Sequence, residues 1–551
     1  MQTPPTDREN KLFSFPALSY ILISFIVVAF GQPAWGSWLP GLSAILGYAL
    51  FWKVLTCATS AFQRFCLATA WFFAVQLVQL FWFVSHPYWY IISVYLFLSI
   101  MIGFQFGIIG ILLYPQKLKN PLYGVFIALL WTVFEFSRLF VLSGFSFNPV
   151  GLSLTGNLYS LQMASLFGIY GLSFWVFLTN LALLPVLIQS DRFKKKYYFL
   201  LWAFLAAFPY LYGAIHIKVH ENAMKQSPPP SLTALLVQTA FPVEETLGFN
   251  HDVMVHYVMN EWTEIIKILK PYRHKSIDLI VLPEFVVPFG TYSFVYPLKD
   301  VVKIFSEELG EEVQKYLPPP QFPLSSKQDG STYVSNAYWI AAIANYFNAD
   351  ILAGLEDAEI DNEGKTQYYS SAQLFRPLQK NTPFPFPDRY EKRVLVPMGE
   401  YIPFGWCRDL AAEYGVFGSF TAGKEAKVMQ CKNASIAPSI CYEETFTNII
   451  VECKEKGATL LVNVTSDVWY PNSLLPRQHF DHARLRTVET GLPLIRACNT
   501  GITVAFDSLG KIIAVYGGEH FEKAEWERGA LLVDVPLYHY NTLYSWLMKT
   551  R

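Results

Sequence analysis

Residues 88–113 read YWYIISVYLFLSIMIGFQFGIIGILL and contain no charged side chain. About 20 apolar residues are enough for a helix to cross the hydrocarbon core of a bilayer. Six further stretches of this kind are found at 15–31, 38–56, 63–85, 121–142, 160–189 and 198–216. The sequence therefore predicts a transmembrane bundle of about seven helices in residues 1–220.

Charged residues are distributed unevenly along the 551-residue chain. Of the 42 Lys and Arg and the 43 Asp and Glu residues, only 16 lie in the first 220 positions. Residues 221–551 approach the charged fraction of an ordinary soluble domain, about 25%. The net charge of −1 argues against the basic surface that a nucleic-acid partner requires. We expect two bodies, a membrane bundle and one soluble domain, with no nucleic-acid partner.

Basic residues alternate from loop to loop between the predicted spans. The N-terminal tail and the second, fourth and sixth loops carry them, whereas the first, third and fifth loops carry none. The residues concerned are Arg8, Lys11, Lys53, Arg64, Lys117, Lys119, Arg192, Lys194, Lys195 and Lys196. Loops rich in Lys and Arg face the cytoplasm. After seven crossings the soluble half is therefore expected outside the cytoplasmic membrane.

Two charged residues lie inside one predicted span. Glu135 and Arg138 are three positions apart, on one face of the helix. Charges inside a membrane are candidates for function. Two interpretations stay open, a self-neutralising pair that locks helix packing and a site for a lipid headgroup.

Residues 221–231 (ENAMKQSPPPS) predict a stiff, Pro-rich linker. After the linker, short apolar runs typical of strands alternate with helical patterns. The runs are 233–237, 277–282, 351–355, 434–440, 459–464, 502–506 and 530–535. We predict that residues 232–551 form an α/β domain with a buried sheet.

Three chemically capable side chains follow apolar stretches of this domain. Glu284 follows the run 277–282, Lys392 precedes an apolar stretch that also contains Glu400, and Cys441 follows the run 434–440. Each has an ordinary structural interpretation when taken alone: a turn, a solvated loop lysine and an inert core thiol.

Together, the three residues form a set that can perform acyl chemistry. A thiol becomes a good nucleophile when a base removes its proton, and a carboxylate with a raised pKa can be that base. A cation then stabilises the oxyanion of the tetrahedral intermediate. Glu284, Lys392 and Cys441 would supply the base, the oxyanion stabiliser and the nucleophile. The seven cysteines show no CxxC pair and no zinc-type spacing, so we expect neither a metal nor a cofactor.

The order of these residues resembles the carbon–nitrogen hydrolase (nitrilase) superfamily. With the membrane bundle in front, the chain resembles the apolipoprotein N-acyltransferase family over nearly its whole length. In the membrane half the resemblance lies in WTVFE at 131–135, GF at 144–145 and GIYGLSF at 168–174. In the soluble half it lies in VQ at 237–238, PE at 283–284, KRVLVPMGEYIP at 392–403, CYE at 441–443, NVTSDVW at 463–469, QH at 478–479, AR at 483–484 and RACNTG at 496–501.

The resemblance implies an α-β-β-α sandwich and assigns roles to six residues. Glu284 would be the general base, Lys392 the oxyanion stabiliser and Cys441 the nucleophile. Glu400 would position Lys392, while Tyr442 and Glu443 would shape the pocket beside the thiol. The partners would be a phospholipid acyl donor and a diacylglyceryl apolipoprotein acceptor. The location would be the bacterial inner membrane, with the catalytic domain on its periplasmic side.

Three features depart from the family pattern. Residues 239–243 read TAFPV in place of a Gly-Asn-Ile-Pro-Gln type of stretch, and no tryptophan occurs between them and Trp262. The separation of Glu284 and Lys392 predicts an insertion near 298–335. The chain stops at Arg551 without the further transmembrane helix expected at the end of a family member.

Two other functions stay open at this point. A membrane-tethered, nitrilase-like amidase would use the same three residues but pass the acyl group from a small amide to water. A transporter or sensor with a degenerate catalytic domain would not need Cys441.

Overall fold

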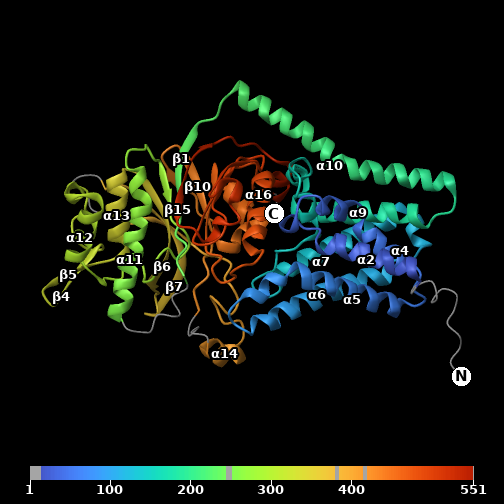
Figure 1. The fold of residues 1–551 in the computed structure, drawn as a ribbon, viewed down its shortest axis with the longest axis horizontal. Coiled ribbons are helices and arrows are strands. Elements are labelled where there is room, and N and C mark those ends of the chain that lie inside the picture. The colour runs from blue at the N-terminus through green and yellow to red at the C-terminus, as the bar shows by residue number, and fades with distance from the viewer. Residues whose placement is uncertain (1–13, 243–250, 379–383, 414–418, 550–551) are drawn as a thin grey trace. The chain divides into compact units, whose positions relative to one another are not determined.

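The computed structural model describes residues 14–242, 251–378, 384–413 and 419–549. The chain divides into two compact units (Figure 1). Unit 1 contains the described residues up to Ser227 and two later segments, 470–489 and 541–549, whereas unit 2 contains 228–469 and 490–540. The two later segments were predicted as parts of one continuous soluble domain that begins at residue 232.

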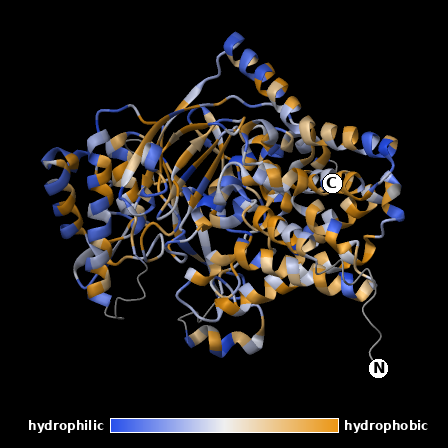
Figure 2. Ribbon diagram, turned by 45° about the vertical axis from the view of Figure 1, so that its right-hand side comes forward, coloured by the Kyte–Doolittle hydropathy of each residue, from blue (hydrophilic) through white to orange (hydrophobic). Residues whose placement is uncertain are grey.

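Apolar helices build most of unit 1 (Figure 2). Within the described residues, five are long and apolar enough to cross a membrane: α5 (Ala61–Gln79), α6 (Ile91–Leu112), α7 with the turn η5 (Pro121–Phe140), α9 (Ala164–Ile188) and α10 (Arg192–Gln226). Shorter apolar helices are α2 (Phe15–Ala29), α3 (Leu39–Leu42) and α4 (Tyr48–Leu55). Each of the seven predicted stretches contains a helix, and the number of crossings stays a prediction.

The two charged residues of the predicted span 121–142, Glu135 and Arg138, are buried. The Glu135 carboxylate accepts hydrogen bonds from Trp131 Nε1 at 2.9 Å and from Val150 N at 2.8 Å. Arg138 Nε donates to Gln105 Oε1 at 2.9 Å. Glu135 is 2% exposed and Arg138 is 3% exposed. Glu135 Oε2 and Arg138 Nη2 are buried without a hydrogen-bond partner among the described residues, so both interpretations stay open.

Hydrogen bonds explain why the two later segments belong to unit 1. On α16 (Leu475–Thr490), Gln478 donates to the Gln79 carbonyl at 3.1 Å, and His482 Nε2 lies 3.0 Å from the Phe147 carbonyl. Thr542, which caps α17 (Leu543–Met548), donates to the Glu489 carbonyl at 2.6 Å. Because such bonds join positions far apart in the chain, the local pattern of the sequence did not reveal them.

The linker is shorter than the sequence predicted. Helix α10 continues to Gln226, and strand β1 (Ser231–Gln238) begins five residues later. Residues 221–226 read ENAMKQ, a run of mostly good helix formers, so they extend the helix until Pro228 prevents its continuation.

Unit 2 contains two six-stranded sheets. The first has the order β15 (Gly529–Pro536), β1, β2 (Leu279–Val281), β6 (Asp350–Ile360), β7 (Thr366–Phe375) and β8 (Asp388–Glu391). The second has the order β14 (Ile512–Val515), β13 (Val504–Phe506), β12 (Leu494–Cys498), β11 (Leu460–Thr465), β10 (Ala434–Ile440) and β9 (Met429–Cys431). Strands β1, β2 and β6 are parallel, as are β10, β11 and β12.

The first sheet is buried on both faces. In β1, Leu232, Ala234 and Leu236 belong to the core between the two sheets. Leu235 and Val237 belong to a second core with helices α11 (His251–Leu269), α12 (Leu298–Leu309) and α13 (Asn336–Phe347). Successive side chains of a strand point to opposite faces, so one strand serves both cores. Helix α15 (Thr447–Glu455) joins the parallel strands β10 and β11. The predicted fold class, a helix bundle plus an α-β-β-α sandwich, is confirmed.

The segment expected to contain an insertion is folded. It includes α12, the turn η9 (Glu311–Lys315), β4 (Ser325–Gln328) and β5 (Ser331–Val334). Strands β4 and β5 form a small sheet with β3 (Tyr296–Pro297).

Candidate active site

Three strand ends supply the three predicted reactive side chains. Glu284 lies three residues after β2, and Lys392 directly follows β8 in the same sheet. Cys441 directly follows β10 in the second sheet. Residues that follow a strand are no longer paired within the sheet. In open α/β sheets, ligands bind at the ends of strands.

Lys392 lies between two carboxylates. Its Nζ donates to Glu284 Oε1 at 2.8 Å and to Glu400 Oε1 at 2.7 Å. The Lys392 side chain is 1% exposed, and those of Glu284 and Glu400 are 5% and 11% exposed. Burial opposes the lysine charge, but the two carboxylates outweigh it and hold the pKa of Lys392 well above its ordinary value. The ammonium therefore stays charged, as an oxyanion stabiliser must.

Cys441 adopts a strained backbone conformation. Its φ is +55°, in the left-handed region that side chains other than glycine rarely adopt. Such strain persists where the surrounding structure imposes it, and it is concentrated at functional sites. The residue as a whole is partly buried.

The proton of the thiol has a suitable acceptor. Burial raises the pKa of Cys441 well above that of a free thiol, and the nearby Glu284 carboxylate adds to the shift. Burial also raises the pKa of Glu284, against the opposing effect of Lys392. A neutral thiol beside a carboxylate of raised pKa is the arrangement that general-base catalysis requires.

The two residues after the cysteine have different surroundings. Tyr442 donates to the Leu395 carbonyl at 2.9 Å, and its ring lies 5.8 Å from Lys392 Nζ. Tyr442 therefore contacts the site, in line with its predicted place.

Glu443 is fully buried and is bound by the ends of two strands. It accepts hydrogen bonds from four donors: Arg393 N (2.6 Å), Val394 N (3.1 Å), Ile440 N (2.9 Å) and Tyr390 Oη (2.9 Å). The first two follow Lys392 and the third precedes Cys441. Glu443 thus holds together the backbone beside Lys392 and the backbone beside Cys441. The predicted role, shaping the pocket, did not include this contact.

Sequence reasoning did not single out Ser466 and Asn499, which support Glu284. The Ser466 backbone N–H donates to Glu284 Oε2 at 3.2 Å. Asn499 Nδ2 donates to Ser466 Oγ at 3.2 Å, and its Oδ1 accepts from Thr239 Oγ1 at 2.6 Å and from Phe241 N at 2.7 Å. Both residues occur in motifs that carried the resemblance. Residues 239–243, which depart from the family pattern, are thus joined to the site through Thr239 and Phe241. Val243 lies outside the described residues.

Replacing Asn499 by alanine is expected to disturb Glu284 through Ser466. Loss of the Ser466 N–H bond would disfavour the charged carboxylate, so the acid limb of the pH–rate profile should move to higher pH. Single-turnover rates of enzyme acylation across pH measure this shift. Asn345→Ala is the control, because Asn345 makes similar bonds, to Tyr316 O and Leu378 N, away from these residues. An unshifted profile in Asn499→Ala would contradict the expectation.

Gly354 on β6 provides the space for the loop that carries Glu284. A Cβ atom at Gly354 would lie 2.5 Å from Glu284 Cα and 2.5 Å from the Pro283 carbonyl oxygen. Since both contacts are with backbone, a side chain there must displace the loop.

Gly354→Ala is therefore expected to slow acylation about a hundredfold, because a displacement of roughly 1 Å at reacting groups has this effect. Gly405→Ala is the control, since no atom lies within 4 Å of the corresponding Cβ position. Acylation rates of folded, purified variants provide the measurement. Equal rates in the two variants would show that the loop adjusts without cost.

No group of three or more His, Cys, Asp and Glu side chains in the described part of the chain could hold a metal ion. The site consists of a base candidate, a cation and a thiol, which together can form and break a thioester.

Comparison with known proteins assigns the class. Residues 250–537 match the carbon-nitrogen hydrolase family, and residues 24–182 match the N-terminal domain of apolipoprotein N-acyltransferases. The apolipoprotein N-acyltransferase of Chlamydia pneumoniae is 30% identical over 95% of this chain and 93% of its own length. That of Chlamydia caviae is 32% identical over 96% of this chain and 94% of its own length. The chain therefore belongs to the apolipoprotein N-acyltransferase family.

A solved structure of a carbon-nitrogen hydrolase from Helicobacter pylori is 16% identical, covers 58% of this chain and 92% of its own, and has a TM-score of 0.33. The family membership rests on the full-length relatives. The family membership confirms two predictions: the resemblance found in the sequence motifs and the assignment of the protein to the acyltransferases.

Proposed function

We propose that this protein transfers an acyl chain from a membrane phospholipid, through a thioester on Cys441, to the N-terminal amine of a diacylglyceryl-modified apolipoprotein. This is the last step of lipoprotein maturation. The observation that carries the proposal is the buried contact of Glu284 and Lys392, in a chain that also contains helices long and apolar enough to cross a membrane. The curated relatives named above support it.

In the first half-reaction, Glu284 takes the proton of the Cys441 thiol, and the sulfur attacks an ester carbonyl of the phospholipid. The Lys392 ammonium stabilises the oxyanion that forms. The bond between the carbonyl carbon and the glycerol oxygen then breaks. Protonated Glu284 returns its proton to that oxygen, and the lysophospholipid leaves.

In the second half-reaction, the amine of the acceptor attacks the thioester carbonyl. Glu284 takes a proton from the nitrogen, and Lys392 again stabilises the oxyanion. The carbon–sulfur bond breaks, and the sulfur regains a proton from Glu284. The product is an N-acylated lipoprotein, and the enzyme returns to its starting state without a cofactor or metal.

The other three predicted positions fit supporting roles in this scheme. Glu400 accepts from Lys392 Nζ and from Val396 N at 2.8 Å, so it orients the ammonium. Tyr442 lies beside that ammonium. Glu443 holds the backbone on both sides of the site.

The curated relatives support a bacterial inner-membrane location, and the alternation of basic loops supports an orientation with unit 2 on the periplasmic side. There, the phospholipid donor and the lipid-modified acceptor share one membrane surface.

The fate of the acyl group distinguishes transferase from amidase. The purified protein would be incubated with phosphatidylethanolamine, with and without a synthetic peptide that begins with a diacylglyceryl cysteine. Transfer predicts N-acylated peptide and lysophospholipid in equal amounts, with little free fatty acid. Fatty acid release that does not depend on the peptide, or turnover of small amides alone, would favour the hydrolase.

A further inference from the structure

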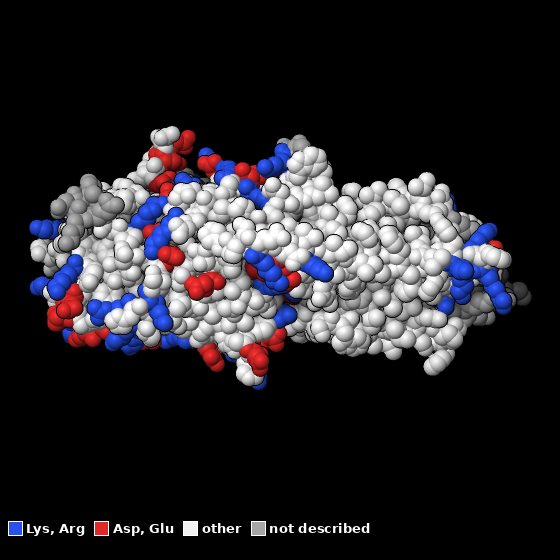
Figure 3. Space-filling view, turned by 90° about the horizontal axis from the view of Figure 1, so that it is seen from above, with Lys and Arg blue, Asp and Glu red and all other residues white. Residues whose placement is uncertain are grey.

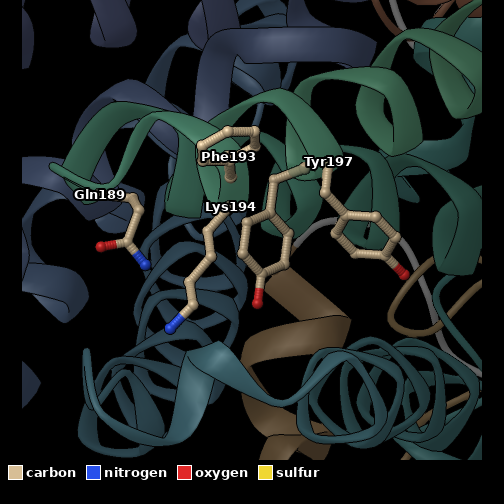
Figure 4. Close-up of a pocket in the computed structure, with 5 residues that line it drawn as sticks. Gln189, Phe193, Lys194 and Tyr197 are labelled. Carbon is tan, nitrogen blue, oxygen red and sulfur yellow. The ribbon is translucent and has the colours of Figure 1, made fainter.

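A pocket lies where α9 ends and α10 begins, in unit 1. It has a volume of about 390 Å³ and is lined by Gln189, Phe193, Lys194, Tyr197 and Tyr198. The Tyr198 side chain is 8% exposed and belongs to a small core with Leu183 and Val186 of α9. Figure 4 shows the Gln189 amide and the Lys194 ammonium pointing to the same side of the first turn of α10. The pocket thus combines an aromatic wall with two nitrogen donors.

The pocket belongs to a strongly basic surface. Arg192, Lys194, Lys195 and Lys196 are all exposed, and Figure 3 shows basic side chains gathered at this end of unit 1. Among the described residues, no ion pair or hydrogen bond engages these four charged groups. The nearby Asp191 carboxylate is directed to the Phe193 and Lys194 backbone N–H groups, at 2.9 and 3.3 Å.

Lys53 and Lys117, which lie in two other predicted loops, contact side chains within the protein. Lys53 donates to Tyr20 Oη at 2.8 Å. Lys117 lies over the Tyr114 ring, 5.5 Å from its centroid. The four basic side chains at the start of α10 have no such contact among the described residues, and they are exposed to an external anion.

The surroundings of the pocket indicate what that anion is. Phe193 is 89% exposed and Tyr197 is 58% exposed, and aromatic side chains of this kind collect at the membrane–water boundary. The next turn presents Phe199 and Leu200, 47% and 58% exposed, as a surface for acyl chains. Basic residues next to a span attract anionic headgroups.

We propose that this pocket binds the phosphate of an anionic phospholipid, with Lys194 as its principal cation. The lipid tails would lie along the apolar side of α10, and Phe193 and Tyr197 would lie at headgroup level. Because this lipid is held by unit 1 and not by the residues around Cys441, it is a bound structural lipid and not the acyl donor.

Native mass spectrometry of the full chain in detergent tests the proposal, with phosphatidylglycerol as the titrated probe. Lys194→Gln should weaken the apparent affinity about fivefold, the usual effect of one basic residue near an anionic lipid surface. Lys117→Gln makes the same change of charge at a lysine with aromatic partners and should leave the affinity unchanged. Gel filtration and circular dichroism verify that both variants are folded.

Equal binding by wild type and Lys194→Gln would overturn the proposal. The basic residues 192–196 would then serve only to orient the protein in the membrane. Equal weakening in both variants would also overturn it, because the effect would then be one of total charge. A third arm adds millimolar inorganic phosphate. Retained phosphatidylglycerol is expected, whereas full displacement would show that the pocket takes free phosphate and not a lipid.

Discussion

Cys441→Ala is expected to carry no acyl adduct after incubation with phosphatidylethanolamine, whereas the wild type gains the mass of one acyl chain. The wild-type adduct should disappear with hydroxylamine, as a thioester does. Loss of the nucleophile should lower turnover on the order of 10⁴-fold or more. Alanine has a Cβ atom, as cysteine does, so the substitution does not relax the backbone at φ +55° in the way that glycine would. Intact-protein mass spectrometry makes the comparison directly.

Cys453→Ala is the matched control for this experiment. Cys453 is a thiol of the same unit, buried on α15, and burial raises its pKa to about 12. Its replacement should leave the adduct unchanged. An adduct that persists in Cys441→Ala would exclude this residue as the nucleophile. Full transfer activity in Cys441→Ala would support the alternative function that does not need this cysteine, a transporter or sensor with a degenerate catalytic domain.

Lys392→Met is expected to affect both catalysis and stability. Removal of one oxyanion donor usually lowers turnover 10²- to 10³-fold, so acylation should fall by about that factor. The change also leaves Glu284 and Glu400 buried without their cation. Breaking a buried ion pair in this way costs about 3–5 kcal/mol of the free energy of unfolding. Acylation rates and thermal unfolding in detergent measure the two effects separately.

The stability loss in Lys392→Met should depend on pH with a definite sign. Lys392 lowers the pKa of Glu284 against the effect of burial, so its removal raises that pKa further above the unfolded value. A protonated carboxyl group is accommodated in the site, whereas a charged one is not. The variant should therefore be closest to wild type near pH 5 and lose stability as the pH rises toward about 8. A pH-independent difference would contradict this account.

Lys432→Met serves as the control for that series. Lys432 Nζ lies 3.1 Å from Asp278 Oδ1, but the lysine side chain is 37% exposed. Exposed ion pairs contribute about 1 kcal/mol or less, so this variant should be almost as stable as the wild type at both pH values.

Several parts of the fold and site could be predicted because local sequence determines them. Uncharged stretches such as 88–113 must form helices in a membrane, since the backbone has no other way to satisfy its polar groups there. Apolar runs before Glu284 and Cys441 predicted strands, and the structure has β2 and β10 at these places. The identity of the reactive residues followed from their chemistry together with a family resemblance.

Other features depend on contacts between distant positions, which local patterns do not record. Glu284 and Lys392 are 108 positions apart, and the order of strands in the first sheet brings their side chains to a 2.8 Å contact. The four donors to Glu443 likewise come from segments of two different sheets. The CYE motif alone therefore could not show that Glu443 holds these segments together.

By itself, the sequence determined an apolar helical half and an α/β half, because hydrophobic periodicity is a local property, and together with the family resemblance it predicted the set of Glu284, Lys392 and Cys441. Only the tertiary structure decided that residues 470–489 and 541–549 belong with the helical unit, and that Ser466 and Asn499 support Glu284. Those features are hydrogen bonds between residues that lie from 33 to 399 positions apart in the chain. They come into being only when strand order and helix packing bring such segments together.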